Sequence, residues 1–451
     1  MTDATFDPLV DQKPSRYVVG IDLGTTNSAV TYIDTEASDW KIEVLSIPQL
    51  VAAGETESLD TLPSFHFQPA KSGSEDNGLS LPWDKKSPKY CVGAFARDET
   101  AKTSGRGIAS AKSWLCHAAV DRSSDLLPWH GADDVQRLSP VEVSGRYLKH
   151  IRKSWDAQFP SEPLADQDIV LTLPASFDEV ARELTIEAAA VAGLKRVVLI
   201  EEPQAAFYAW VYKHADDWES RVSVGQRILV CDIGGGTTDF TLIRVRKSAD
   251  ETTDGAAKVQ FHRVAVGNHL ILGGDNLDLA IAKYLEQKLT GGKSLEPYQW
   301  DVLVGASRNV KEQLLTTEAE SSMTVSLPGR GAKLLGSGLK TEVTATEIRQ
   351  LILDGFLPSV KLTDQPQRHA SGFQEFGLPY ATDPAISRYL GEFLLTHATA
   401  GDAPIDGDIT LSAPQQTQPS GAARPDVVLF NGGFFASLIL RSTVIKQLEE
   451  W

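Results

Sequence analysis

Along the chain, runs with the apolar pattern of strands alternate with runs that have the pattern of amphipathic helices. This alternation predicts layers of strands and helices. The runs 17–22 (YVVGID) and 28–34 (SAVTYID) have the β-branched composition of strands, and 41–47 (KIEVLSI) predicts a third. Three consecutive strands favour a meander. From 51 to 88 the chain is rich in Gly, Ser, Pro and acidic residues, which predicts a long loop with one short strand near 64–67.

A strand, helix, strand order comes next, and it predicts a crossover connection and a sheet that is parallel in part. The strand 168–173 (DIVLTL) is followed by Ser176, which with an acidic residue three positions later predicts a capping box. The helix is expected to end at Gly193, before a strand at 196–200 and a second helix that Pro203 opens. The expected apolar face of the first helix consists of Val180, Leu184, Ala188 and Val191.

The second half of the chain repeats the Gly-rich arrangement of strand, turn and strand, over 227–232 and 240–245. The low-complexity run 412–425 predicts a surface segment, 427–431 a buried strand and 437–450 a helix. The sequence stops in that helix without a Gly or Asn cap. We therefore expect the chain to be a fragment of a longer protein.

The net charge, the cysteine content and the lack of long apolar runs exclude several classes of protein. The chain has 451 residues with a formal net charge of −17, so its field repels a polyanion, and a nucleic-acid-binding protein held by phosphate contacts is excluded. Three cysteines with no CxxC spacing predict neither a disulfide framework nor a zinc site, which favours the cytoplasm. The sequence shows no secretory signal and no apolar run of about 18 residues, so no membrane association is expected.

Two matched motifs carry the candidate chemistry: VVGIDLGTTNSAVTYI (18–33) and ILVCDIGGGTTDFTLI (228–243). Each has an apolar strand, an aspartate, a Gly-rich turn with Thr-Thr, and a second strand. Glycines let the backbone approach an anion closely with its N–H groups, and threonine hydroxyls add donors. The aspartates, Asp22 and Asp232, supply hard oxygens for Mg²⁺, directly or through water. Two such turns closing on one ligand would let an acidic protein bind an acidic nucleotide.

Other phosphate loops do not fit these motifs. A Walker loop requires GxxxxGK[ST] before a helix, and a dinucleotide fingerprint requires GxGxxG before a helix, whereas strands follow here. A tight hairpin with glycines at positive φ is the alternative explanation for either motif alone. The matched pair favours phosphate binding.

The two motifs resemble the phosphate signatures of the heat-shock protein 70 chaperones of the DnaK type. IDLGTTNS (21–28) and DIGGGTTDFTLI (232–243) carry the resemblance, although IDLGTT alone also fits sugar kinases. Three further stretches agree in order and spacing: LTLPASFDEVARELTIEAAAVAGL with EEPQAAF (171–207), LGGDNLD (272–278) and VVLFNGG (427–433). The resemblance implies an actin-like ATPase fold, an α/β architecture of two similar lobes. Each lobe would have a five-stranded mixed sheet flanked by helices, with the nucleotide in the cleft between them.

The resemblance also implies a division of the chain. Lobe I would span 17–216 after a tail at 1–16, with a peripheral subdomain at about 45–145. Lobe II would span 221–451. It would include a peripheral subdomain at about 266–363 and an inserted segment at 364–425 that typical members lack, with a helix from about 384. The family's peptide-binding domain is absent from this sequence.

The resemblance assigns residues by position to the phosphates, the metal and the nucleoside. The phosphates of ATP or ADP would be wrapped by Asp22, Gly24, Thr25, Thr26 and Asn27 from lobe I and by Asp232, Gly234, Gly235, Gly236 and Thr237 from lobe II. Asp22 and Asp232 would hold Mg²⁺ through water, with K⁺ as a second candidate ion, and Asp239 and Glu202 would position the attacking water. Gly273, Gly274, Lys311, Gly432 and Gly433 would line the nucleoside side. Pro174 and Arg182 match residues that relay the nucleotide state.

Several positions depart from the family pattern. VGAFAR (92–97) puts Arg97 where the family has a lysine that reaches the γ-phosphate, and arginine differs from lysine in size and hydrogen-bonding shape. At the adenine site, Arg308 and Leu315 replace a glutamate and a serine, and Phe434 and Phe435 follow the last glycines. These aromatic residues predict either a stacked adenine pocket or a piece of the core.

Other polar residues have ordinary explanations. His117, His262 and His269 lack the order and motifs of a catalytic triad and are expected to be structural or solvated. For Lys102, Arg106 and Lys112 the alternatives are a basic rim near the cleft and a solvated face, and the solvated face is expected.

The expected function is a slow ATPase that couples nucleotide state to a downstream peptide-binding domain. Asp22, Arg97, Glu202, Asp232 and Asp239 are the expected catalytic residues. Cochaperones or a nucleotide-exchange factor are the expected partners, with client peptides bound only through the missing domain. Two alternatives stay open: a nucleotide-binding switch that does not hydrolyse ATP, and a sugar kinase of the same fold.

Overall fold

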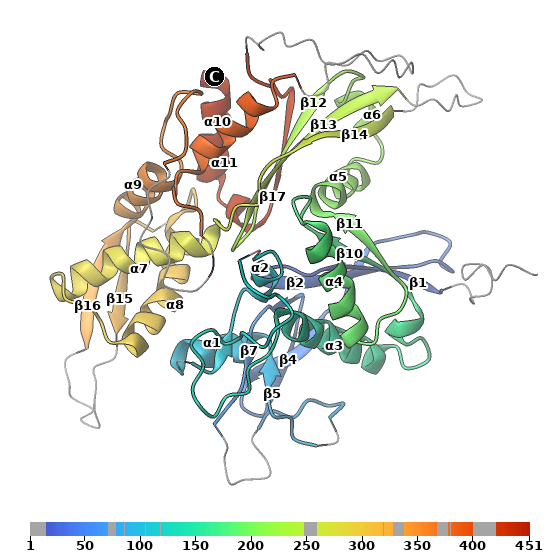
Figure 1. Ribbon diagram of the computed structural model, residues 1–451, viewed down its shortest axis with the longest axis vertical. Helices are drawn as coiled ribbons and strands as arrows, with labels where there is room; N and C mark the ends of the chain where they lie inside the picture. Colours follow the sequence, from blue (N-terminus) through green and yellow to red (C-terminus); the bar gives the residue numbers. More distant parts are fainter. Residues whose placement is uncertain are drawn as a thin grey trace, which may run out of the picture.

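Each of two lobes contains a central sheet, and the lobes face one another across the middle of the molecule in this computed structural model (Figure 1). The structure describes residues 15–70, 78–84, 86–103, 105–117, 119–247, 259–318, 320–327, 338–367, 378, 380–399 and 421–451. The expected tail at 1–16 therefore lies almost entirely outside the described residues.

The sheet of the first lobe is mixed, as predicted. Its strands run in the order β11-β10-β1-β2-β3, and β6 pairs with the other end of β2. β1 pairs antiparallel with β2 and parallel with β10, which itself pairs parallel with β11. The strands are β1 (Tyr17–Asp22), β2 (Asn27–Asp34), β3 (Glu43–Val44), β6 (Thr61–Pro63), β10 (Asp168–Leu173) and β11 (Val197–Glu201). The meander and the crossover are confirmed, and Asp22 ends β1 at the turn into β2.

The helix of the crossover, α4 (Glu179–Val191), differs from the prediction at its start and on its buried face. Asp178 is the N-cap, and its carboxylate accepts from the Ala181 N–H at 2.8 Å. Ser176 is not the cap, because its hydroxyl bonds to the carboxylate of Asp239 in the other lobe. The buried face consists of Ala181, Leu184, Thr185, Ala188 and Ala189.

α4 packs closely against α3 (Pro140–Gln158). A Cβ added to Gly145 of α3 would lie 2.7 Å from Val191 Cγ1 and 3.1 Å from the Ala188 carbonyl oxygen, so the close approach of the two helices requires a glycine at position 145. Val180 and Val191, which were predicted to be buried, are 51% and 42% exposed. Gly193, with a φ of 79°, follows the C-terminus of α4 as predicted.

The loop predicted at 51–88 is wrong up to residue 63, where the structure has strands, whereas the short strand predicted near 64–67 is confirmed as β7. β4 (Ile47–Ala52) and β5 (Glu55–Leu59) form an antiparallel hairpin, and β7 (His66–Phe67) pairs with both β8 (Cys91–Val92) and β9 (Gly107–Ile108). Of the predicted strand 41–47, only residues 43 and 44 form a strand of the central sheet, β3, and Ile47 instead begins the hairpin of β4 and β5. β5 is almost wholly exposed, so it lacks the alternation by which a strand is recognised.

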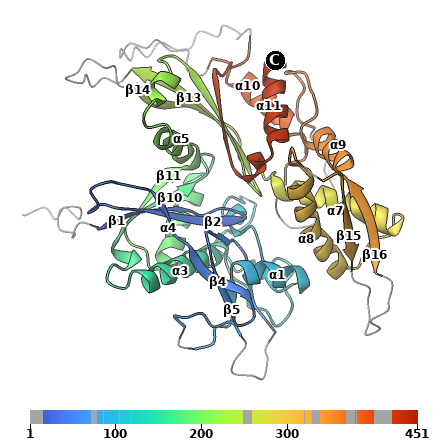
Figure 2. The same ribbon diagram turned by 180° about the vertical axis from the view of Figure 1, so that it is seen from behind.

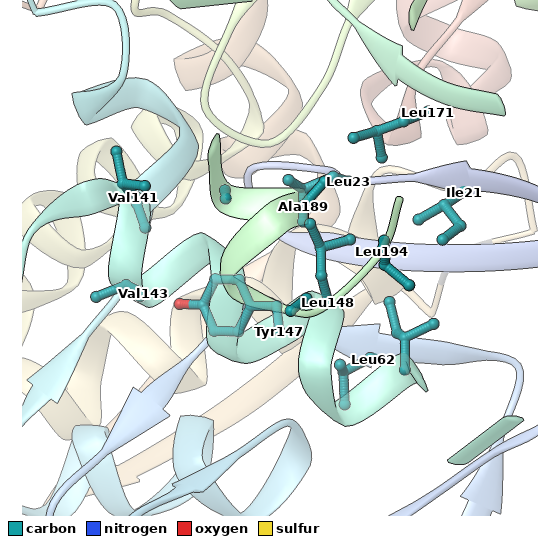
Figure 3. Close-up of a cluster of buried hydrophobic side chains, with 14 of the residues drawn as sticks. Ile21, Leu23, Leu62, Val141, Val143, Tyr147, Leu148, Leu171, Ala189 and Leu194 are labelled. Carbon is teal, nitrogen blue, oxygen red and sulfur yellow. The ribbon is translucent and has the colours of Figure 1, made fainter. Parts of the chain in front are cut away.

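The larger of two hydrophobic clusters in the described part of the first lobe packs its central sheet against helices (Figure 3). It joins the sheet residues Ile21 and Leu171 to Leu148 of α3 and Ala189 of α4. The phenol of Tyr147 is buried in this core and donates to the Ser64 carbonyl at 2.9 Å, so its polar atom is satisfied. This core holds the ends of β1 and β10, and with them Asp22, in fixed positions. The lobe's remaining helices are α1 (Ala94–Lys102), α2 (Ala111–Trp114) and the short 3₁₀ turn η1 (Leu164–Asp166).

The second lobe has a smaller mixed sheet in the order β14-β13-β12-β17. The strands are β12 (Arg227–Ile233), β13 (Thr238–Lys247), β14 (Val259–Val266) and β17 (Val427–Asn431). Within the described residues the two central sheets thus have six and four strands, not the five each that the resemblance implied. β17 was predicted to be buried but is half-buried, because it pairs only with β12, at the edge of the sheet.

Helices and a separate hairpin complete the second lobe. They are α6 (Trp218–Arg221), α7 (Gly274–Thr290), α8 (Pro297–Leu314), β15 (Ser322–Leu327), β16 (Leu339–Thr344), α9 (Ala345–Phe356), α10 (Ile386–Thr396), η3 (Gly433–Ala436) and α11 (Leu438–Glu450). The helix expected from about 384 is α10, and its Ile386, Leu390 and Phe393 belong to the lobe's core. Most of the low-complexity run 412–425 lies outside the described residues.

The helix α5 (Glu202–Lys213) connects the two lobes. It follows β11 of the first lobe, yet its Phe207 packs with Ile228 and Ile243 on the sheet of the second lobe. Figures 1 and 2 both place α5 between β11 and the β12–β14 sheet. A shift between the lobes must therefore involve α5. The predicted domain boundaries, including those of the peripheral subdomains, stay predictions.

None of the helices in the described part of the chain is both long and apolar enough to cross a membrane.

Candidate functional site

A cavity of about 550 Å³ lies between the lobes and is lined by both Gly-rich turns. The residues from lobe I lie at the turn from β1 to β2 or belong to α1, α2 and α5, and those from lobe II lie at the ends of β12 and β17 and in the turns after them, or in and next to α7, α8 and α11. The predicted site residues that line it are Asp22, Gly24, Thr25, Thr26, Asn27, Arg97, Glu202, Asp232, Gly234, Gly235, Thr237, Gly274, Lys311, Gly432 and Gly433. The structure thus gathers residues from seven separate segments at one place.

The two Gly-rich turns touch each other across the cleft. A Cβ added to Gly235 would lie 1.8 Å from Thr26 Oγ1, and one added to Gly236 would lie 2.6 Å from Thr25 Cγ2. Only glycine fits at such distances. Thr26 Oγ1 also donates to Asp275 Oδ2 at 3.3 Å, which links the first turn to the start of α7. The matched turns therefore meet at the base of one cavity.

Backbone contacts hold the second turn in shape. The N–H groups of Gly274 and Asp275, at the start of α7, donate to the carbonyls of Gly234 and Gly235 at 3.0 and 2.7 Å. Gly273 lies directly behind this turn, because a Cβ on it would be 2.6 Å from the Gly235 carbonyl oxygen. Gly273 therefore supports the turn and does not itself line the cavity.

Lys112 is the buried cation of the site. It lies on α2, is 7% exposed, and forms an ion pair with Glu202 at the start of α5. Burial alone would lower the pKa of Lys112, but Glu202 and Asp22 outweigh that effect, so its pKa is raised. The expectation of a solvated Lys112 was wrong. The sequence contains one hint: Lys112 lies in ASAKSWL (109–115), among small and apolar residues. In the structure Ala111 and Trp114 of this stretch are buried with it.

Arg97 lies at the cavity but in a different environment from the one expected. Its Nε atom is 2.9 Å from Asp98 Oδ1, and both side chains are more than 40% exposed. Arg97 belongs to the first turn of α1, and this neighbouring carboxylate engages its guanidinium. In this structure the cation among the carboxylates is Lys112, and Arg97 is at the exposed margin.

Three carboxylates surround Lys112 with different degrees of burial. Asp22 is exposed and accepts from Thr172 Oγ1 at 2.8 Å, whereas Asp232 is buried and accepts from Asn431 Nδ2 at 3.0 Å. Burial raises the pKa of Asp232 well above its usual range, and the charge of Glu202 adds to that effect. Burial likewise raises the pKa of Glu202, although Lys112 opposes the rise. The crowding of negative charge makes this a place that favours a bound cation.

Asp239 lies behind the cavity in a contact between the lobes. It is 3% exposed, and its carboxylate accepts from the Ser176 hydroxyl and lies 3.2 Å from His269 Nδ1. Burial lowers the pKa of His269, but Asp239 outweighs burial and raises it to about 10. His269 is therefore a charged structural partner of Asp239, in line with the structural role expected for it. No local pattern in the sequence indicates the bond from Ser176.

An ion network holds the side of the cavity that the resemblance assigns to the nucleoside. Lys311 Nζ lies 2.7 Å from Asp278 Oδ1 and donates to the Gly274 carbonyl at 2.9 Å. Arg308 bridges Asp275 and Asp278, at 3.2 Å to each. Cationic and anionic partners thus neutralise one another at the position where the resemblance predicts the adenine contacts.

The aromatic residues after the last glycines are mainly core. Phe434 and Phe435 are 6% and 1% exposed and pack in the hydrophobic core of lobe II, although Phe434 also reaches the cavity wall. Gly432, before them, has a φ of 88°, and a Cβ there would lie 2.2 Å from the Ile233 carbonyl oxygen. Glycine is thus required at this turn.

A family model described as Hsp70 protein matches residues 100–358, which is more than half of the chain. The chain belongs to the Hsp70 family. Members of this family are chaperones with the actin-like ATPase fold, and the two lobes with their mixed sheets agree with it. The predicted family and fold class are thereby confirmed.

Three relatives within the Hsp70 family show how far the similarity extends. The chaperone protein HscA homolog of Acinetobacter baylyi is 29% identical over 303 residues, covering 66% of this chain and 42% of the relative. The HscA homolog of Colwellia psychrerythraea is 27% identical over 343 residues, covering 75% and 47%. The chaperone protein HscA of Salmonella paratyphi C is 29% identical over 282 residues, covering 60% and 38%. The chain thus matches less than half the length of these relatives.

The donor set of this Hsp70-family site suits a hydrated ion better than a directly bound one. Within the described residues, no three His, Cys, Asp or Glu side chains lie close enough together to ligate a metal. Asp22, Asp232 and Glu202 nevertheless place several negative charges around one cavity. Mg²⁺ keeps several waters of its shell when it binds beside phosphates. The residues therefore fit an ion held through water.

Proposed function

We propose that this chain is the nucleotide-binding part of an Hsp70-family chaperone, and that it binds ATP and hydrolyses it slowly. One observation carries the proposal: two Gly-Thr turns from different lobes touch at the base of one 550 Å³ cavity, beside a buried lysine among carboxylates. This arrangement matches a triphosphate, because backbone N–H groups and one cation can neutralise charge that the chain as a whole repels.

Phosphate binding is assigned to the two turns. Gly24 to Asn27 would hold the phosphates from lobe I, and Gly234 to Thr237 from lobe II. Gly274, Lys311 and Gly432 would face the nucleoside. Since the turns come from different lobes, a ligand that contacts both favours the closed arrangement over an open one.

Hydrolysis is assigned to Lys112 and Glu202. The ammonium of Lys112 would offset the charge that develops on the γ-phosphate, the role first expected of Arg97. Glu202, which lines the cavity, would accept a hydrogen bond from the attacking water and hold it in line, whereas Asp239, expected to share this role, lies behind the cavity and is engaged by Ser176 and His269. The water oxygen forms a bond to the γ-phosphorus while the bond to ADP breaks, with no covalent enzyme intermediate.

A hydrated Mg²⁺, held by Asp22 and Asp232 through its waters, would supply charge neutralisation on the β- and γ-phosphates. The raised pKa of Asp232 indicates how strongly this position favours added positive charge. K⁺ stays a second candidate ion.

Transmission of the nucleotide state is assigned to the contacts between the lobes. Glu201 at the end of β11 pairs with Arg182 of α4 at 2.8 Å and also with Arg263 of β14 in the other lobe. Arg182 is one of the two residues that the resemblance names as a relay. A change in lobe angle would alter this pair and the position of α5. A downstream peptide-binding domain, cochaperones and a nucleotide-exchange factor are the proposed recipients, and the cytoplasm is the proposed location.

Single-turnover hydrolysis tests the proposal. The wild-type chain is mixed in excess with γ-³²P-ATP and Mg²⁺, and phosphate release is compared with that of Asp232→Asn and of the surface control Asp354→Asn. We expect release by the wild type and the control, and a loss of about 10²-fold or more in Asp232→Asn. Absence of ATP binding in the wild type would refute the proposal.

A non-hydrolysing switch is the second candidate, favoured by the ion pair that already engages both Lys112 and Glu202. Tight ATP binding without phosphate release in the same assay would select it. ADP release that depends on an added polyol would instead select a sugar kinase.

A further inference from the structure

A second cavity, of about 420 Å³, lies in the peripheral part of lobe I and shares no lining residue with the cleft. One wall is a face of α3, and the other consists of residues within 79–84 and 86–92, of which the last two form β8. Its volume falls in the range of small-molecule sites, about 300–1,000 Å³. No function proposed above uses this cavity.

The walls of this second cavity are strongly basic. Arg146, Lys149 and Lys153 follow one another at helical spacing on α3, and Lys86 and Lys89 approach from the opposite wall. Asp84 is the sole carboxylate that lines the cavity within the described residues. A chain with a net charge of −17 therefore concentrates five cations around one hollow.

Among the residues that the structure describes, part of this positive charge has no carboxylate partner. Lys153 pairs with Asp84 at 2.8 Å, and Arg146 pairs with Glu142 at 3.0 Å. In the described residues no ion pair joins Lys86, Lys89 or Lys149 to a carboxylate, and Lys89 and Lys149 are exposed at the mouth. Like charges three and four residues apart destabilise a helix, so an anion in the cavity would relieve a cost already present in the fold.

Aromatic rings form part of the wall of the second cavity. Trp83 lies edge-on to the ring of His150 at 5.5 Å, and Tyr90 stacks at 4.9 Å on His66, which lies behind the wall. Burial lowers the pKa of His66 to about 3, with help from Arg146, and burial lowers that of His150 to about 4. Both imidazoles are therefore neutral, so these rings add no positive charge to that of the lysines.

We propose that this cavity binds a small phosphate ester with a flat apolar body. Lys86, Lys89 and Lys149 would contact the phosphate, and Trp83 would contact the flat part. Lysine is a compact point charge that suits phosphate, whereas the fork of Arg146 is already engaged by Glu142 and His66. The proposal is independent of the nucleotide site.

Calorimetric titration of the full chain with phenyl phosphate and with inorganic phosphate tests the proposal. Both titrations are run with and without saturating Mg-ATP, so that binding in the cleft is separated from binding here. The variants are Lys89→Gln with Lys149→Gln, and a control of equal charge change, Lys293→Gln with Lys361→Gln, in lobe II. Trp83→Leu tests the apolar contact.

We expect phenyl phosphate to bind more tightly than inorganic phosphate, with or without Mg-ATP. The Lys89 and Lys149 variant should weaken it by about tenfold or more, because two charged contacts are lost, while the lobe II control should change it little. Trp83→Leu should remove the advantage of phenyl phosphate over phosphate. Equal weakening in both lysine variants, or equal affinity for the two probes, would overturn the proposal. A tyrosine-phosphorylated peptide that binds more tightly than phenyl phosphate would overturn the assignment to a small molecule.

Discussion

Replacing Lys112 by methionine is expected to destabilise the fold and to stop hydrolysis. The side chains of Lys112 and Glu202 are 8% and 14% exposed, so the change leaves a buried carboxylate without its cation. Breaking a buried ion pair from one side costs about 3–5 kcal/mol, a large part of an ordinary total stability of about 5–15 kcal/mol. The pKa of Glu202, already raised by burial, should rise further and bring its protonation closer to neutral pH.

Urea denaturation of Lys112→Met, Glu202→Gln and the double variant measures this cost. The double variant should be more stable than the sum of the single changes predicts, because it leaves no unpaired charge. Because the pKa of Lys112 is raised in the folded state, the ion pair stabilises the fold fully at neutral pH, below the ordinary lysine pKa of about 10.4. This stabilisation is lost as the pH rises through the raised pKa of the folded state.

Phosphate release separates the catalytic role of Lys112 from that of Arg97. Lys112→Met should slow single-turnover release by about 10²- to 10³-fold, the typical effect of removing one group that stabilises developing charge. Arg97→Met should change the rate by less than about threefold, because Arg97 pairs with Asp98 at the exposed margin. An equal loss in both variants, or unchanged stability in Lys112→Met, would show that this view of the site is wrong.

Two further changes test the turn contact and an ion pair of lobe II. Gly235→Ala places a methyl group 1.8 Å from Thr26 Oγ1, which should cost about 1–3 kcal/mol through overpacking. Calorimetry should therefore show weaker ATP binding. The control Gly305→Ala in α8 meets no atom within 4 Å and should leave stability unchanged or slightly raised. Hydrogen bonds from Lys288 and from the start of α9 lower the pKa of Glu347 to about 2, so its contribution is present above about pH 4.3 and is lost as the pH falls toward 2. In urea denaturation between pH 5 and 2.5, Glu347→Gln should flatten this loss, and a curve that keeps the wild-type slope would contradict the assignment.

Strong local patterns made much of the fold predictable. β1, β10 and β17 have the predicted bounds, since β-branched runs ended by Gly, Pro or Asp leave few other conformations. The region 51–88 was misread because β5 is exposed on both faces and therefore lacks the alternation of a half-buried strand. The exposure of Val180 and Val191 on α4 was missed because the burial of a helix face depends on how the helix packs in the folded lobe.

The candidate site was predictable only in part. The turns around Asp22 and Asp232 were identified because glycine, threonine and aspartate in one order have few alternative explanations. Lys112 was misjudged because its environment depends on Glu202, 90 residues away in the sequence. Ser176 and Asp239 lie in different lobes, and their contact has no trace in either local sequence.

The sequence by itself determined the strands, the two phosphate turns, the acidic field and the family. These properties depend on residues within a few positions of each other, or on the whole composition. Only the tertiary structure decided which cation occupies the cleft, which face of α4 is buried, how α5 connects the lobes, and where a second basic cavity forms. The physical reason is that desolvation and ion pairing depend on distances between segments, and these distances exist only when the chain has folded.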